Sequence, residues 1–264
     1  MKVGVVGAAG RMGATVCRAV GGDPDMDLVV GVDPSRAGDS LVSVTGAGPQ
    51  GAIIAADLDA LVAAGADVVI DFTSPSVIRS NLAWYAAYGL HAVVGTTGLS
   101  DEDVASVAAE FDPGRGAGCI IAPNFAIGAV LMIRFAEMAA PWFETAEIIE
   151  LHHDAKVDAP SGTAMLTASR MAEASSEWGS DPTRSHVVDG ARGGVGPGGI
   201  HVHAVRLKGL VAHQQVLMGT TGQTLSIRHD SIDREAFMPG VLIAVRAVAD
   251  RPGLTVGLDA VLGI

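Results

Sequence analysis

The sequence predicts an α/β protein in two parts: a parallel sheet covered by helices, followed by an α+β part with a mixed sheet. Three observations support this prediction. Short apolar runs alternate with helical patterns through the first half of the chain. A glycine-rich segment joins the first apolar run to the first helical pattern. Later, three strand-like runs follow one another without helices between them, which favours a mixed or antiparallel sheet.

The first part contains apolar runs that have the length of buried strands. Such strands, separated by helical segments, indicate βαβ units and a parallel sheet. We expect strands at residues 3–6, 28–32, 68–72, 91–94 and 119–122, and helices at 11–20, 76–88 and 101–111. Residues 36–52 are rich in Gly and Ser and are expected to form a loop.

The pattern changes after Phe125, where the second part begins. A glycine-rich loop at 190–199 carries Arg192. The expected helices are 126–140, 162–174 and 234–249, and the expected strands are 147–151, 201–208, 213–218, 224–229 and 254–258. We expect the last helix to return to the first part, so the expected domains are 1–124 with 232–264, and 125–231.

Composition and charge limit the classes of partner. The chain has 264 residues, of which 49% are hydrophobic and 17% charged, as in a globular protein. The net charge of -12 argues against a nucleic-acid or anionic-membrane partner. No apolar run reaches the roughly 20 residues of a membrane span. The chain starts directly with a strand-like run, and Cys17 and Cys119 lack metal-type spacing, so we expect no signal peptide, reduced thiols and a cytoplasmic location.

The glycine-rich segment GAAGRMG, residues 7–13, predicts a Rossmann-like dinucleotide site. Glycines between a strand and a helix let the backbone approach a pyrophosphate, which the helix N-terminus attracts. Asp33 ends the second strand twenty residues after Gly13, where a ribose diol would bind. Asp33 favours NAD and the nearby Arg36 favours NADP, so the cofactor is NADH or NADPH. The alternative is a plain, closely packed strand-to-helix turn.

Two further strand ends point to the same edge of the sheet. The segments GTTG at 95–98 and APNF at 122–125 follow the expected fourth and fifth strands. Ligands of open α/β sheets bind beyond the carboxyl ends of the strands. Thr96, Thr97 and Asn124 are therefore candidate contacts to the nicotinamide and its ribose, and Phe72 is a candidate neighbour of the ring. The alternative for each segment is ordinary turn chemistry.

The segment ELHHDAKVDAPSGTA, residues 150–164, is the strongest candidate site. Three interpretations compete. A metal site is disfavoured because His152 and His153, adjacent on a strand, point to opposite faces, and no third ligand stands at a zinc spacing. Two structural histidines in a core are a second possibility.

The third interpretation is catalytic. An imidazole, and a lysine near other cations, can exchange protons near neutral pH. Ser161 is a helix N-cap candidate, so the first amides of the helix, at Gly162 and Thr163, offer an anion site. His152, His153 and Lys156 complete a positive pocket suited to a small carboxylate, with Arg192 as a further candidate contact.

The four segments 7–13, 95–98, 122–125 and 150–164 together resemble the 4-hydroxy-tetrahydrodipicolinate reductase (dihydrodipicolinate reductase) family of diaminopimelate and lysine biosynthesis. The likeness runs through nearly the whole chain in order, and segments 205–214 and 228–231 are similar to its actinobacterial branch. The resemblance implies reduction of 4-hydroxy-tetrahydrodipicolinate to tetrahydrodipicolinate, with loss of water, by NADH or NADPH. It also implies a homotetramer built by the sheet of the second domain.

The resemblance assigns a role to individual residues. His152 would be the proton donor and acceptor and Lys156 a proton donor, while His153, Gly162 and Thr163 would bind the dicarboxylate substrate. No metal is implied. The cofactor would be bound by Gly7, Ala8, Ala9, Gly10, Arg11, Met12, Asp33, Gly95, Thr96, Thr97, Ala122, Pro123, Asn124 and Phe125.

Two other functions remain as alternatives. A semialdehyde dehydrogenase would need a nucleophilic cysteine, and Cys119 lies in an expected core strand. A non-catalytic nucleotide-sensing protein would keep the glycine loop but would have no use for His152 and Lys156.

Overall fold

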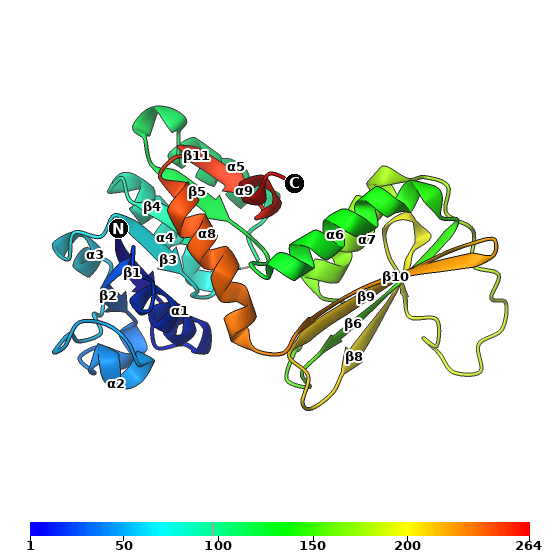
Figure 1. The fold of residues 1–264 in the computed structure, drawn as a ribbon, viewed down its shortest axis with the longest axis horizontal. Helices are drawn as coiled ribbons and strands as arrows, with labels where there is room; N and C mark the ends of the chain where they lie inside the picture. The colour runs from blue at the N-terminus through cyan, green and yellow to red at the C-terminus, as the bar shows by residue number, and fades with distance from the viewer. Residues whose placement is uncertain (97) are drawn as a thin grey trace. The chain divides into compact units, whose positions relative to one another are not determined.

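The computed structural model describes residues 1–96 and 98–264 and divides into two compact units. Unit 1 comprises Met1–Phe125 and Phe237–Ile264, and unit 2 comprises Ala126–Ala236. Both are drawn in Figure 1, where the chain leaves unit 1 for unit 2 and returns at its red end. The second boundary thus lies at 236/237, whereas the sequence had suggested 231/232.

Unit 1 is built on a six-stranded sheet in the order β11-β5-β4-β3-β1-β2. All paired strands are parallel, which confirms the predicted sheet. Residues of β1, β3, β4 and β5 are buried almost throughout, as expected of strands covered on both faces. The strands are β1 (Lys2–Val6), β2 (Asp27–Val32), β3 (Val68–Asp71), β4 (His91–Val94), β5 (Gly118–Ile121) and β11 (Gly253–Val256).

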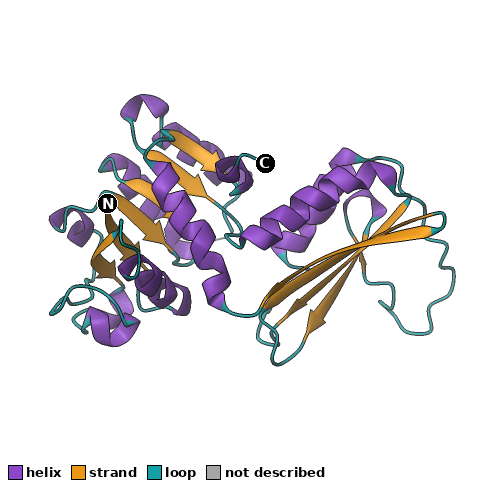
Figure 2. Cartoon of the chain, viewed as in Figure 1, coloured by secondary structure: helices purple, strands orange, loops and turns teal. Residues whose placement is uncertain are grey.

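Helices cover both faces of this sheet (Figure 2). The first helix, α1 (Arg11–Gly21), packs beside α8 (Met238–Val248), while α4 (Pro75–Ala87) packs beside α5 (Asp101–Glu110). Ser100 begins α5 with a capping box, in which Ser100 and Asp103 bond each other's backbone N–H groups. The shorter helices are α3 (Asp59–Ala63) and α9 (Asp259–Leu262).

One expectation about unit 1 is wrong: residues 36–52 are not all loop. They contain the short helix α2 (Leu41–Thr45), which Ser40 caps by accepting a hydrogen bond from the Ser43 N–H. Leu41 is fully buried in space that Gly31 and Gly48 leave open, since a Cβ at either glycine would lie within 2.8 Å of its side chain. With only Leu41 and Thr45 buried, α2 has no periodic signal, so composition alone suggested a loop.

Unit 2 has a five-stranded sheet in the order β10-β9-β6-β8-β7. The central pair β6 and β8 is parallel and the other pairs are antiparallel, which confirms the predicted mixed sheet. The strands are β6 (Thr145–His152), β7 (Gly194–Val195), β8 (His201–Arg206), β9 (Ala212–Thr220) and β10 (Gln223–Ser231). The helices α6 (Ile127–Ala139) and α7 (Gly162–Ala174) lie side by side on one face of it (Figure 1).

The core of unit 2 lies between this sheet and the two helices. Ile148, Val202 and Val216 project from the sheet and pack with Ala136 and Ala168 of the helices. Because side chains alternate along a strand, Ile149, Leu151 and Leu217 lie on the opposite face, where they are half-buried. The face of the sheet away from α6 and α7 is therefore partly apolar.

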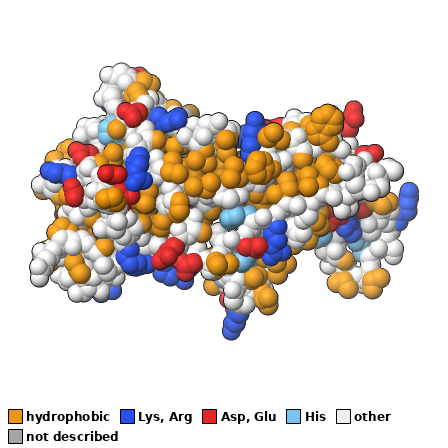
Figure 3. Space-filling model, in the orientation of Figure 1, with side chains coloured by type: hydrophobic (Ala, Val, Ile, Leu, Met, Phe, Trp, Pro, Cys, Tyr) orange, Lys and Arg blue, Asp and Glu red, His pale blue; other side chains and the backbone are white. Residues whose placement is uncertain are grey.

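The distribution of charge and the length of the apolar helices are relevant to nucleic-acid and membrane partners. On the face shown in Figure 3, Lys and Arg side chains lie among Asp and Glu side chains rather than in one broad basic patch. Among the residues that the structure describes, none belongs to a helix long and apolar enough to cross a bilayer.

The contact between α1 and the glycine loop yields a test of the fold. A Cβ at Gly13 would lie 1.9 Å from the Gly7 carbonyl oxygen, whereas a Cβ at Gly10 would lie 3.2 Å from it. Alanine gains about 1 kcal/mol of helix propensity over glycine, but a backbone clash of this severity costs about 3 kcal/mol. Denaturant unfolding should therefore show that Gly13→Ala destabilises the protein more than Gly10→Ala does, because the contact at Gly10 is milder. Equal free energies of unfolding for the two variants would contradict this packing.

Candidate active site

The first candidate site is a cavity of about 380 Å³ in unit 1. It opens beyond the carboxyl ends of β1, β2 and β3, where the chain order of the sheet reverses between β1 and β3. Ligands of open α/β sheets bind at such a switch point. The lining includes Gly7, Gly10, Asp33, Phe72, Thr73 and Asn81.

The glycine loop follows β1 directly and borders this cavity. Gly7 adopts a φ of +77°, and a Cβ there would lie 2.8 Å from the Phe72 carbonyl oxygen, so only glycine fits. The Gly7 N–H donates to the Val32 carbonyl oxygen at 2.9 Å. Gly10 is the N-cap residue of α1 and has no side chain to occupy the first amides of the helix. Ala8 and Ala9 in the turn, and Arg11 and Met12 at the start of α1, do not line the cavity.

Asp33 stands at the end of β2, where a ribose would bind. One carboxylate oxygen accepts a hydrogen bond from the Ala9 N–H at 3.1 Å, and the other accepts from the Ser35 N–H and hydroxyl. The carboxylate thus connects the glycine loop to the loop after β2. Arg36 is paired with Asp39.

The ends of β3, β4 and β5 converge around an aromatic side chain. The ring of Phe72 packs against Gly95, where a Cβ would lie 2.0 Å from the ring, and against Phe125, at 5.9 Å between ring centroids. Ala122 is buried and Pro123 is exposed. Asn124 is half-buried, and Thr97 lies outside the described residues.

Two observations show that these residues fit a dinucleotide. The buried hydroxyl of Thr96, a residue only 6% exposed, has no hydrogen-bond partner among the described residues. A buried polar group without a partner is costly unless a ligand supplies one. The second observation is Gly10, which lines the cavity and is the N-cap residue of α1 without a side chain that caps the helix.

The second candidate site lies in unit 2, at the end of β6. Glu150 is fully buried there, and each of its carboxylate oxygens accepts two hydrogen bonds. Oε1 accepts from Arg206 at 2.8 Å and from the Ser161 N–H at 3.1 Å. Oε2 accepts from Arg206 at 2.8 Å and lies 2.5 Å from Nδ1 of His152. Arg206 comes from β8, which pairs with β6 so that His152 and Arg206 are opposite each other.

This cluster shifts the pKa values of Glu150 and His152. Burial opposes the ionisation of Glu150, but the hydrogen bonds from Arg206 and His152 outweigh it and hold the pKa of Glu150 below its usual value. Burial also lowers the pKa of His152, and the hydrogen bond to Glu150 partly opposes that decrease. His152 therefore loses its proton more easily than a solvated histidine.

Lys156 lies on the loop after β6. Its Nζ donates to both oxygens of Asp158, at 2.8 and 2.7 Å. Arg206 donates to the backbone carbonyl oxygen of Asp158 at 2.6 Å, so the loop that holds Lys156 is tied to the Glu150 cluster. His153 is half-buried, and its carbonyl oxygen accepts from the Lys156 N–H.

The start of α7 completes this site. Ser161 caps the helix as predicted: its hydroxyl accepts from the Ala164 N–H at 3.2 Å, and the residue is 3% exposed. Gly162 is exposed, and a Cβ there would meet open space. Thr163 follows in the first turn. An anion can thus approach the amino end of α7 beside His152 and Lys156.

Sequence reasoning did not identify three residues of this site: Glu150, Asp158 and Arg206. A strand places residues i and i+2 on the same face, so Glu150 could have been identified as a neighbour of His152. Arg206 is 56 residues from Glu150 and gave no comparable signal. The two carboxylates make the pocket less positive than the sequence suggested. Within the described residues, no group of three or more His, Cys, Asp or Glu side chains could hold a metal ion.

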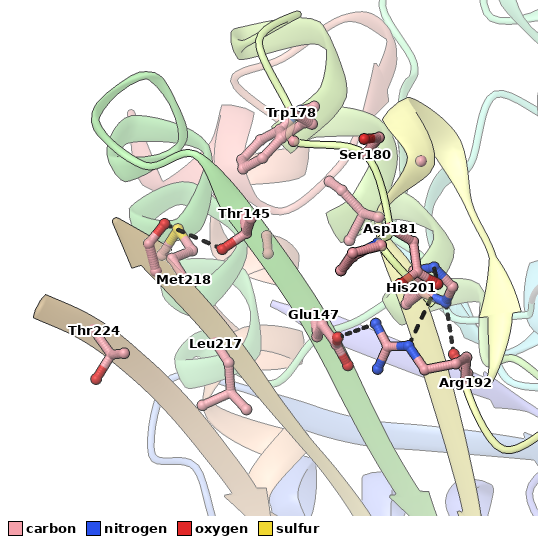
Figure 4. A pocket seen from close by; sticks show the side chains of 16 residues that line it. Thr145, Glu147, Trp178, Ser180, Asp181, Arg192, His201, Leu217, Met218 and Thr224 are labelled. Carbon is pink, nitrogen blue, oxygen red and sulfur yellow. Dashed lines mark hydrogen bonds and ion pairs between the residues drawn. The ribbon is translucent and has the colours of Figure 1, made fainter. Parts of the chain in front are cut away.

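The sequence also suggested that Arg192 contacts an anion. In the structure Arg192 donates to Glu147 at 2.5 Å and pairs with Asp181 at 3.4 Å, so two carboxylates already engage it. These residues line a different cavity of unit 2, of about 420 Å³ (Figure 4). The structure therefore does not place Arg192 with His152 and Lys156.

The cysteines do not support thiol chemistry. Cys17 and Cys119 are both fully buried and free. Burial raises the pKa of Cys17 to about 12 and raises the pKa of Cys119 as well. A thiol is nucleophilic as the thiolate, so neither residue is suited to the role required in a semialdehyde dehydrogenase.

Comparison with known proteins gives consistent results. Residues 1–125 match the family model for the N-terminus of dihydrodipicolinate reductase, and residues 128–262 match the model for its C-terminus. The 4-hydroxy-tetrahydrodipicolinate reductase of Mycolicibacterium vanbaalenii is 50% identical over 100% of both chains, and that of Cutibacterium acnes is 49% identical over 100% of this chain and 99% of the other. A dipicolinate-bound dihydrodipicolinate reductase from Paenisporosarcina is 39% identical, with a TM-score of 0.84 over 98% of each chain.

Proposed function

The chain belongs to the dihydrodipicolinate reductase family, and on this premise we propose how its residues carry out the reaction. The reaction is the NAD(P)H-dependent reduction of 4-hydroxy-tetrahydrodipicolinate to tetrahydrodipicolinate with loss of water, a step of diaminopimelate and lysine biosynthesis. The observation that carries the proposal is the cluster at the end of β6, where His152, Lys156 and the start of α7 lie together.

Unit 1 holds the nucleotide. The loop from Gly7 to Met12 and the amino end of α1 bind the pyrophosphate, and Asp33 binds the ribose. The bound nucleotide gives the buried hydroxyl of Thr96 a hydrogen-bond partner. The remaining contacts come from Gly95, Thr97, Ala122, Pro123, Asn124 and Phe125. When bound, the reduced nicotinamide supplies the hydride.

Unit 2 holds the substrate and moves the protons. The amides at Gly162 and Thr163 bind one carboxylate of the dicarboxylate, and His153 contacts the substrate. Hydride addition to the conjugated ring leaves negative charge that a proton must neutralise. Because Nδ1 of His152 faces Glu150, its Nε2 is the atom that exchanges a proton with the substrate. Lys156 leaves Asp158 to contact the substrate and, with His152, serves as the source of this proton, from Nζ.

We further propose that the chain forms a homotetramer in the cytoplasm. The partly apolar face of the unit 2 sheet, with Ile149, Leu151 and Leu217, supports self-association because burial of such a face is favourable. The free state of Cys17 and Cys119 is in keeping with a reducing compartment.

The first experiment tests the reaction and the role of Lys156. Purified protein should oxidise NADH or NADPH, followed by nicotinamide absorbance, only when the product of dihydrodipicolinate synthase is present. Lys156→Ala should lower kcat about 100-fold or more, because a proton donor is lost, with nucleotide binding intact. Lys2→Ala, at an exposed position of unit 1, is the matched control and should behave as wild type. Absence of substrate-dependent oxidation would overturn the function, and loss of nucleotide binding in Lys156→Ala would overturn the role.

The second experiment tests the ribose site. A 2′-phosphate would meet the Asp33 carboxylate, so Asp33→Asn should weaken NADH binding about tenfold through a lost charged hydrogen bond, and NADPH binding less. Arg36→Gln should have the opposite effect, with weaker binding of NADPH and unchanged binding of NADH. Fluorescence titration of both nucleotides measures the four dissociation constants. Equal changes for the two nucleotides in both variants would place the ribose elsewhere.

The third experiment tests self-association. Leu217→Asp puts a charge on the partly apolar face of the sheet and should reduce the mass measured by light scattering from that of a tetramer. Met138→Asp, on α6 and 60% exposed, is the control and should leave the mass unchanged. A wild-type monomer, or a tetramer that Leu217→Asp does not affect, would refute the assignment of this face.

A further inference from the structure

The carboxylate of Glu150 is the most completely engaged side chain at the proposed substrate site. An ionised carboxylate has about four lone-pair positions, and here four hydrogen bonds occupy them. Two come from Arg206, one from the Ser161 N–H and one from Nδ1 of His152. The side chain is fully buried, so solvent does not compete with these donors.

Each donor belongs to a different part of the site. His152 exchanges the proton in the proposed reaction, and Ser161 begins the helix whose amides bind a carboxylate. Arg206 in turn holds the carbonyl oxygen of Asp158, whose carboxylate pairs with Lys156. One buried carboxylate is therefore linked to the proton donors and to the anion site at once.

The bond to His152 determines which ring nitrogen can react. A carboxylate accepts hydrogen bonds and cannot donate one, so Nδ1 carries a proton in both the neutral and the charged ring. Nε2 is then left to exchange a proton with substrate. This arrangement favours the charged ring more than a neutral partner would, because the imidazolium lies against a negative charge.

We propose that Glu150 is a positioning residue for this reaction: it fixes the tautomer and orientation of His152 and aligns the Ser161 amide and, through Arg206, the loop of Lys156 with it. The inference rests on the proposed function. It predicts that an amide at this position cannot replace the carboxylate. A glutamine has a single oxygen, so two of the four donors would face an NH₂ group instead.

The chain offers a matched control in Glu147, three residues earlier on β6. Glu147 also accepts from an arginine and a histidine, with Arg192 at 2.5 Å and His203 at 2.6 Å. Figure 4 shows the Glu147–Arg192 pair in its own cavity. Glu147→Gln thus removes the same kind of charge from the same strand without touching His152.

The test compares Glu150→Gln, Glu150→Asp and Glu147→Gln with wild type, through the pH dependence of kcat and kcat/KM. The charged groups that surround His152 are Glu150 on its own strand, Arg206 on β8, and Lys156 and Asp158 on the following loop. If protonated His152 is the donor, kcat/KM falls as pH rises through the pKa of the free enzyme. Loss of the negative charge lowers that pKa, so the descending limb should move to lower pH by about one unit in Glu150→Gln.

Glu150→Gln should also lower kcat about 100-fold while KM for the substrate changes only severalfold. Glu150→Asp keeps the negative charge but is one methylene shorter, so it should shift the descending limb of the pH profile less. This variant keeps the test informative if Glu150→Gln does not fold. Glu147→Gln should retain the wild-type limb and kcat. Nucleotide binding and melting temperature show that each variant is folded.

The outcomes separate the two hypotheses. Wild-type protein without substrate-dependent oxidation refutes the proposed function itself. A second outcome is that the wild type is active and the Glu150 variants are folded, but their descending limb and kcat match those of Glu147→Gln. This outcome refutes only the positioning role. A fall in melting temperature with an unmoved limb likewise shows that Glu150 serves stability only.

Discussion

A carboxylate buried at the end of β6 determines the geometry of the proposed substrate site. Burying a charge is costly unless it is fully paired, and Glu150 meets this condition through Arg206, His152 and the Ser161 N–H. Because these partners come from β8, β6 and the start of α7, the pairing can form only when the unit 2 sheet and helix are assembled. The pairing that stabilises this part of unit 2 thus also positions the side chains that we propose to be reactive.

In unit 1 the candidate nucleotide site is positioned mainly by close backbone packing rather than by a buried ion pair. Gly7 and Gly13 let the turn after β1 pack against α1, and Asp33 bonds the Ala9 N–H from the neighbouring strand end. Asp71 is buried at the end of β3 and accepts from Tyr85, Asn81 and Thr73. Within the described residues, the edge of the sheet is therefore already ordered around the cavity.

Features of the fold that depend on local sequence patterns could be predicted from the sequence. Apolar runs and helical periodicity predicted both sheets, and Ser161 and the glycine loop were identified from short motifs. Contacts made across the sheet were not predictable in this way: the pairing of β6 with β8 brings Arg206 to Glu150, and no local pattern specifies that register. The five-residue helix α2 was missed because its two buried side chains, Leu41 and Thr45, give no periodic pattern. Arg192 was only a candidate contact, and the loop at 190–199 gave no indication of its partner, Glu147.

The central claim is that Glu150 holds the proton of the neutral His152 ring on Nδ1 and leaves Nε2 to react. Long-range proton–nitrogen NMR of protein labelled with ¹⁵N-histidine measures this directly, with the His152 signals assigned from their loss in His152→Gln. At a pH above the pKa of the ring, the account predicts a protonated Nδ1 and an unprotonated Nε2 in wild type. A ring protonated on Nε2, or one that exchanges freely between both tautomers, would contradict it.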